Sequence, residues 1–224
     1  MMDEFVAGWL ALPTWVQYFL AYIFLIFIMM LAQPMWRQRR VSERFAALAQ
    51  ALGATVTPGA DKSIASFEIE REGRRFTLRR ELRDAPRSNS TYRGPRGDLL
   101  FCETPLAGDN WKRHGVDIAE EAALPLMSMR PFKTGDAAFD NRFTAWQDGV
   151  PVRSGWLDSA PRGAVTAFFD TTPLSGALWV REGLLQYVGD APKGMAPAAL
   201  EDVLRAQCAV ALAFERSAAH EGAF

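Results

Sequence analysis

The chain of 224 residues is poor in the residue types that carry most catalytic and metal chemistry, with only two cysteines and two histidines. Two cysteines exclude a disulfide framework, and no HExxH, CxxC or EF-hand spacing is present to bind a metal. No GxSxG elbow, P-loop or dinucleotide fingerprint occurs. We therefore expect no catalytic residue, no cofactor and no metal site. Cys102 lies in the apolar run Leu99–Cys102, which is typical of an inert, packed thiol, and Cys208 has no assigned role.

Charge is missing from one long stretch, since no Asp, Glu, Lys or Arg occurs from Phe5 to Trp36. Within it, the run from Trp15 to Ala32 is almost wholly apolar, and Gln17 is its one strongly polar residue. A bilayer core of ~30 Å needs about 20 helical residues. The pattern predicts an N-terminal tail and a single transmembrane helix within residues 1–36. Pro34 lies near the predicted exit of this helix.

Positive charge follows this stretch and does not precede it, with Arg37, Arg39 and Arg40 directly after the apolar run. The positive-inside rule then predicts that the N-terminus is outside and that residues 37–224 are cytoplasmic. Arginine far outnumbers lysine, which favours a GC-rich bacterium and hence a bacterial inner membrane. These three arginines and the aromatic residues of the stretch are the expected contacts with membrane or partner: Trp9, Trp15, Tyr18, Tyr22, Phe24, Phe27 and Trp36.

The rest of the chain divides by pattern into a basic amphipathic helix, residues 37–53, and an α+β domain, residues 54–224. In the helix, Ser42 is the expected N-cap and Gly53 the stop. Its apolar residues have helical spacing and are expected to pack on the domain: Phe45, Leu48, Ala49 and Leu52.

Two hairpins are predicted in this domain, turning at Glu72-Gly73 and at Glu182-Gly183. In the first, a two-residue loop pairs Glu70 with Arg75, Ile69 with Phe76 and Phe67 with Leu78, which matches charge with charge and core with core. The shared Arg-Glu-Gly turn suggests two similar halves, residues 54–130 and 131–224.

Later segments complete the expected fold. Alternation predicts strands over Phe139–Trp146 and Ala164–Phe169, and a short helix is expected within 150–158. Pro197 is expected to open a final helix that runs to about Ala218. The expected fold class is α+β: antiparallel hairpins covered by a few helices, attached to one transmembrane helix.

A basic segment from Arg71 to Arg96 holds nine arginines against three acidic residues. A nucleic-acid-binding domain normally has a basic total, whereas this chain has a net charge of −1, so a nucleic-acid partner is not expected. Anionic lipid headgroups or an acidic partner are better candidates for this segment. The alternative is a solvated strand face whose charge is balanced by acidic residues elsewhere in the fold.

The segment Thr134–Phe143 contains the pattern Gly-Asp-x-x-Phe-Asp-x-x-Phe. With the apolar N-terminus and the hairpins, this pattern resembles a group of bacterial single-pass membrane-anchored proteins that have no established activity. The resemblance implies architecture and no reaction. Four residues form a candidate site near it: His114, Asp136, Asp140 and Arg142.

The preferred functional hypothesis is a non-enzymatic interaction protein, an accessory or assembly subunit of a bacterial membrane complex for bioenergetics or transport. Its partners would be other membrane subunits, contacted through the aromatic helix. Two alternatives stay open: a membrane-tethered enzyme or ligand sensor with a site near His114, Asp136 and Arg142, and a protein that binds anionic lipid surfaces.

Overall fold

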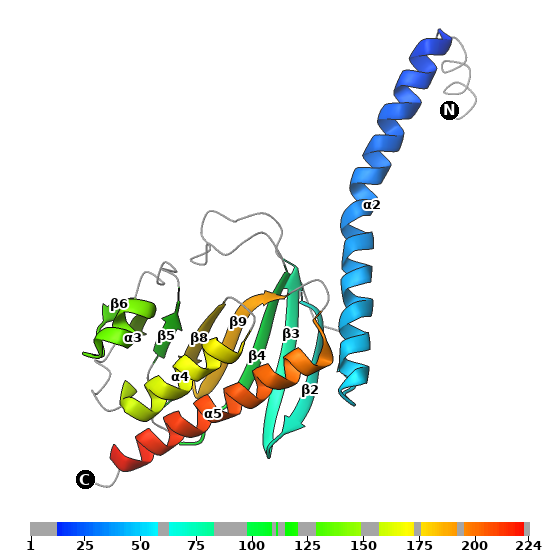
Figure 1. The fold of residues 1–224 in the computed structure, drawn as a ribbon. Helices are drawn as coiled ribbons and strands as arrows, with labels where there is room; N and C mark the ends of the chain where they lie inside the picture. The colour runs from blue at the N-terminus through cyan, green and yellow to red at the C-terminus, as the bar shows by residue number, and fades with distance from the viewer. Residues whose placement is uncertain are drawn as a thin grey trace. The chain divides into compact units, whose positions relative to one another are not determined.

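The computed structural model describes residues 13–57, 63–82, 98–108, 111, 115–120, 129–148, 157–172, 176–191 and 195–221. The chain divides into two compact units, Met1–Glu43 and Arg44–Phe224. Helix α2 (Thr14–Ala51) begins in the first unit, and its last turns belong to the second. The second unit contains the sheet and the remaining helices (Figure 1).

Helix α2 corrects the prediction of a transmembrane segment. Among the described residues, no helix combines the length and the apolar character needed to cross a bilayer. This finding concerns only the part of the chain that the structure describes, which for this region begins at Pro13. The expected fold class is therefore wrong in its membrane helix, and so is the description of the chain as a single-pass membrane protein.

The juxtamembrane helix predicted for residues 37–53 is not a separate element, because α2 is helical past Pro34 and through Ser42 without a break. The burial predicted for its last turns is confirmed, since Phe45 and Ala49 are buried. The ring of Phe45 lies 4.9 Å from that of Phe67 on the sheet. The helix ends at Ala51, two residues before Gly53, which has a φ of 74°.

The strands of the described residues form one antiparallel sheet of nine, in the order β1-β2-β3-β4-β9-β8-β5-β7-β6. Strands β4 and β9, far apart in sequence, pair along their whole length and join the first hairpin to the second. The strands are β1 (Val56–Thr57), β2 (Ser63–Arg71), β3 (Arg74–Leu82), β4 (Asp98–Pro105), β5 (Gly115–Ala119), β6 (Met129–Phe132), β7 (Thr144–Asp148), β8 (Gly176–Arg181) and β9 (Leu184–Ala191).

Both predicted hairpins are confirmed. In β2–β3 the register pairs Glu70 with Arg75, Ile69 with Phe76 and Phe67 with Leu78, as expected. The β8–β9 hairpin turns at the second Glu-Gly pair. Both residues of each turn have φ between 51° and 80°, the conformation that a tight two-residue hairpin requires. Glycine adopts it without strain, which explains why each turn ends in glycine.

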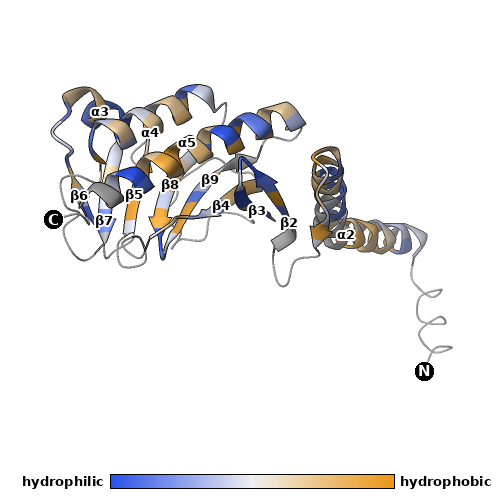
Figure 2. Cartoon of the chain, turned by 90° about the horizontal axis from the view of Figure 1, so that it is seen from below, coloured by the Kyte–Doolittle hydropathy of each residue, from blue (hydrophilic) through white to orange (hydrophobic). Residues whose placement is uncertain are grey.

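Three further helices are α3 (Ala137–Arg142), α4 (Ser159–Thr171) and α5 (Pro197–Glu221). Helices α4 and α5 lie side by side over one face of the sheet (Figures 1 and 2). The helix predicted from Pro197 is confirmed as α5. The short helix expected within 150–158 falls mostly outside the described residues.

Of two further predicted strands, one is right only at its end and the other is wrong. The segment Phe139–Trp146 divides into the end of α3 and the start of β7, because the side chain of Asp136 caps a helix there. The segment Ala164–Phe169 lies inside α4. The buried residues of α4 recur at helical spacing and are Pro161, Val165, Phe168 and Phe169. A window of only six residues does not reveal this spacing.

The core lies between the helices and the sheet. Aromatic side chains fill it, among them Trp111, Phe168 and Phe214, each fully buried. One polar side chain, Gln207 of α5, is fully buried within this core. Its amide nitrogen donates to the backbone oxygen of Cys102 at 2.9 Å and to that of Leu185 at 3.1 Å, so that α5 is tied to the neighbouring strands β4 and β9.

Candidate functional site

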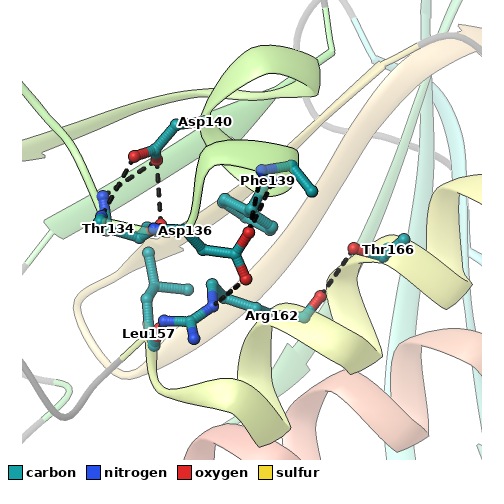
Figure 3. Close-up of polar contacts among 9 residues, drawn as sticks. Thr134, Asp136, Phe139, Asp140, Leu157, Arg162 and Thr166 are labelled. Carbon is teal, nitrogen blue, oxygen red and sulfur yellow. Dashed lines mark hydrogen bonds and ion pairs between the residues drawn. The ribbon is translucent and has the colours of Figure 1, made fainter.

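The Gly-Asp-x-x-Phe-Asp segment builds a short helix with its own cap. Asp136 is the N-cap of α3, and its Oδ1 accepts hydrogen bonds from the backbone N–H groups of Ala138 at 3.0 Å and Phe139 at 3.2 Å (Figure 3). An N-cap of this kind satisfies backbone donors that no intrahelical carbonyl can reach. The glycine-aspartate pair therefore has a structural role at the start of α3.

Asp140 closes the loop that leads into the same helix. Its carboxylate accepts from the backbone N–H and the hydroxyl of Thr134, each at 2.9 Å, and from the N–H of Gly135 at 3.1 Å (Figure 3). Desolvation opposes ionisation of this carboxyl, but the hydrogen bonds from Thr134 and Gly135 outweigh it. The pKa of Asp140 is therefore below its usual value.

Arg162 of α4 faces Asp136 across the gap between the two helices. Its Nε lies 3.4 Å from Oδ2 of Asp136, and its Nη1 donates to the backbone oxygen of Leu157 (Figure 3). The Nε atom is buried and has no hydrogen-bond partner among the described residues. The Arg162 guanidinium is therefore held between the Asp136 carboxylate and the backbone of Leu157.

Arg142, at the last turn of α3, is held by two acidic residues. Its Nη2 donates to Glu120 at 2.7 Å, and its Nη1 donates to Asp170 of α4 at 2.7 Å. Hydrogen bonds to Glu120, and then to Asp170, raise the pKa of Arg142 above its usual value. This guanidinium is therefore committed to structural ion pairs.

A groove of about 530 Å³ lies between α3 and α4, with Asp136 and Arg162 at one end and Arg142 and Asp170 at the other. Gly163 lines it in the middle of α4. A Cβ at this position would meet no atom within 4 Å, so neither packing nor a positive φ requires glycine there. Glycine in a helix interior costs about 1 kcal/mol relative to alanine, and this position keeps the groove open.

The structure brings part of the predicted cluster together. Asp136, Asp140 and Arg142 lie on or beside α3: Asp136 caps the helix, Asp140 holds the preceding loop, and Arg142 pairs with two acidic residues. His114 lies outside the described residues. Sequence reasoning missed Arg162 and Gly163, because α4 was interpreted as a strand. Helical spacing of Arg162 and Thr166 on one face was the signal available.

The two thiols lack the properties of a nucleophile. Burial raises the pKa of Cys102 far above its usual value, and burial also raises the pKa of Cys208, to about 11. Both are therefore protonated thiols near neutral pH, while a reactive cysteine needs a lowered pKa. In the part of the chain that the structure describes, no group of three or more His, Cys, Asp or Glu is placed to hold a metal.

The aromatic residues of α2 form the most apolar exposed surface of the described chain. Trp15, Tyr18, Phe19, Tyr22, Phe24 and Phe27 are between 56 % and 73 % exposed, and we call these six residues the aromatic segment. Trp36 is also exposed, and Arg39 pairs with Glu43 one turn along the helix at 2.9 Å. Trp9 and the side chain of Arg37 lie outside the described residues, and Arg40 is exposed.

Fold and site together define an α+β protein with an antiparallel sheet covered by helices on one face and a charged groove between two of its helices. Comparison of the chain with protein families, with curated proteins and with solved structures finds no match.

Proposed function

We propose that this chain is a non-enzymatic interaction protein, an accessory subunit of a larger assembly that binds a protein partner through the aromatic segment of α2. The exposure of that segment is the observation that carries the proposal. Exposed apolar patches of this kind on proteins mark binding surfaces, because water contact with large aromatic side chains is unfavourable.

The size of the segment fits a specific interface. An aromatic side chain buries about 150–250 Å² when it is fully covered. Six such side chains, each between 56 % and 73 % exposed, offer roughly 580–960 Å² in all. One partner in a standard interface buries about 800 Å². At 3.6 residues per turn, Trp15, Tyr18, Phe19 and Tyr22 share one face of α2, and Phe24 and Phe27 lie on the opposite face. The segment therefore reaches the area of a standard interface when partner contacts cover both faces of the helix.

The chemistry of the segment defines the partner surface. No charged residue occurs from Trp15 to Met30, so a matching surface must itself be apolar. The large side chains of a helix form ridges that fit the grooves of a second helix. We therefore propose an apolar helix of another protein as the occupant.

The arrangement of the polar groups in the second unit supports a binding role over a catalytic one. Asp136 caps α3, Asp140 holds the loop before it, and Arg142 is held by two acidic residues. The thiols of Cys102 and Cys208 have raised pKa values, which disfavours their use as nucleophiles.

A photo-crosslinking amino acid at Phe24 tests the proposal in cells that express the full chain. The matched control carries the same amino acid at Arg205, an exposed position of α5. We expect a discrete adduct with one protein from position 24 and none from position 205, and we expect the purified partner to reproduce it. Equal adducts from both positions, or flotation of the purified chain with lipid vesicles in place of a protein adduct, would refute the proposal.

A further inference from the structure

We propose that α2 pairs with a second copy of this chain, antiparallel and through one face of its apolar run. At about 100° per residue, six side chains of the run lie within roughly 100° of one another around the helix axis. We call these six the pairing face: Trp15, Tyr18, Phe19, Tyr22, Ile26 and Met29. Phe24, where the contact with another protein is tested, lies about 180° from Trp15. The inference therefore goes beyond the proposed function, and either contact can exist without the other.

The run is apolar on every side, so a single partner helix cannot cover it. Every position from Tyr18 to Met30 is aromatic or aliphatic and is exposed in the described chain. A helix that is apolar all round is normally enclosed by other elements. Gln17, the polar residue of the run, lies about 200° from Trp15 and hence outside the pairing face. A partner helix that covers Phe24 therefore leaves the pairing face, which is wholly apolar, to a second occupant.

The size of the side chains changes along the pairing face in a way that fits a second copy of the same helix. The aromatic residues come first, and Ile26 and Met29 follow. In an antiparallel pair centred on Tyr22, Trp15 of one copy faces Met29 of the other, and Tyr18 faces Ile26. Large side chains then meet small ones, which fills the space evenly, and a methionine sulfur packs well against an aromatic ring. A parallel pair would place indole against indole at one end and leave the other end loosely filled.

The charges beyond the run favour the same direction of pairing. Asp3 and Glu4 precede the uncharged stretch, whereas Arg37, Arg39 and Arg40 follow it. An antiparallel pair brings the acidic end of one copy toward the basic end of the other. A parallel pair would bring the two basic ends together, which is unfavourable. Size and charge are independent properties of the sequence, and both make the helix complementary to a reversed copy of itself.

The area of the pairing face fits a stable contact between two copies. Its four aromatic side chains, between 57 % and 73 % exposed, offer roughly 400–660 Å² on each copy. Two copies together can therefore bury about 800–1,300 Å² before Ile26 and Met29 are counted. A specific interface needs about 1,000 Å² in total. A two-fold pair also uses the same surface on both copies, as most homodimers do.

Disulfide cross-linking of the purified full chain tests the direction of pairing, with cysteines introduced singly and the two native thiols left buried. Under mild oxidation, we expect Tyr22→Cys to form a covalent dimer. Trp15→Cys and Met29→Cys should each stay monomeric alone and should form a covalent heterodimer when mixed. Ile28→Cys, at an exposed position on the other side of α2, is the matched control and should stay monomeric. Covalent dimers of Trp15→Cys alone, or equal dimers of Ile28→Cys and Tyr22→Cys, would overturn the proposal.

Sedimentation equilibrium of the purified chain measures the strength of the pair in the absence of any other protein. We expect a monomer–dimer equilibrium with a Kd of about 10 μM or tighter. Tyr18→Ala removes a ring from each copy and should raise this Kd at least tenfold, whereas Ile28→Ala should change it less than about twofold. A wild-type chain that stays monomeric up to about 200 μM, or equal weakening by the two variants, would overturn the proposal. Neither result affects the adduct expected at Phe24, so failure of this inference is distinguishable from failure of the proposed function.

Discussion

The cap at Asp136 offers a quantitative test of the α3–α4 arrangement, through the substitution Asp136→Ala. The side chain makes two backbone hydrogen bonds at the start of α3 and an ion pair with Arg162. Replacing an N-cap aspartate with alanine costs about 1 kcal/mol. The ion pair is partly exposed, with Asp136 39 % accessible, so screening limits its contribution to at most about 1 kcal/mol.

The sum predicts that Asp136→Ala lowers the free energy of unfolding by about 1–2 kcal/mol. For a domain of this size, each kcal/mol corresponds to about 2–4 °C in melting temperature. Urea unfolding followed by circular dichroism measures the free energy directly. Asp136→Asn is the matched control, because an asparagine oxygen still caps the helix while the charge is removed. This control should lose less than half as much stability.

Two results would refute this reasoning. An Asp136→Ala variant as stable as the wild type would show that the cap and the ion pair contribute nothing. Equal losses for the alanine and asparagine variants would show that the charge, and not the capping hydrogen bonds, stabilises α3.

Three further predictions concern the second unit. Gly176→Ala should destabilise the fold by about 1–3 kcal/mol or prevent folding, because a Cβ there would lie 2.4 Å from the backbone oxygen of Val188. A Gly176→Ala variant with the urea stability of the wild type would contradict this close approach. Gln207→Met keeps the shape of the side chain but removes two hydrogen bonds to buried carbonyls, and should lower the free energy of unfolding by about 2–4 kcal/mol in the same assay. An unchanged free energy of unfolding would refute the role of Gln207 in linking α5 to the sheet. The lowered pKa of Asp140 means that its carboxylate stabilises the fold above its unfolded pKa of about 3.9 and loses this effect as the pH falls through the lower folded pKa. The stability difference between wild type and Asp140→Asn should therefore shrink below about pH 4, and a difference that is constant from neutral to acid pH would contradict the pKa shift.

Hairpins were predictable from the sequence because their signals are local. The Glu-Gly turns and the alternation on either side of Glu72 set both the loop and the register. The pairing of β4 with β9 has no such local signal, since it joins segments about 85 residues apart in the chain. The order of the nine strands therefore had to come from the structure.

Helices α3 and α4 were missed for a different reason. Each contains a short apolar or alternating stretch that fits a strand as well as a helix turn, as at Phe139 and Val165. The Asp136 cap and the packing of Phe168 against the sheet favour the helices over strands. Neither interaction can be recognised from a sequence segment of a few residues. The candidate groove was predictable only in part, because one of its two walls is α4.

Composition alone did not predict the N-terminal helix correctly. The absence of charge from Phe5 to Trp36 predicted a membrane span, with a new helix starting at Ser42. In the described residues the helix continues unbroken to Ala51, and no described helix is long and apolar enough to cross a bilayer. The aromatic side chains of that run are nonetheless exposed, and they are the basis of the proposed partner contact.

The central claim, that the aromatic segment of α2 binds a protein partner, is tested most directly by the native size of the full chain after gentle extraction from its own cell. The double substitution Phe24→Leu and Phe27→Leu removes two exposed rings and keeps an apolar helix. At about 0.5–1.5 kcal/mol of ring-specific contact for each, the two changes together should weaken the complex by roughly 5- to 150-fold. We expect the wild type to migrate with a protein partner at fixed stoichiometry, and the double variant to migrate largely alone. A wild-type chain that migrates alone, or a complex unchanged by the double substitution, would contradict the account.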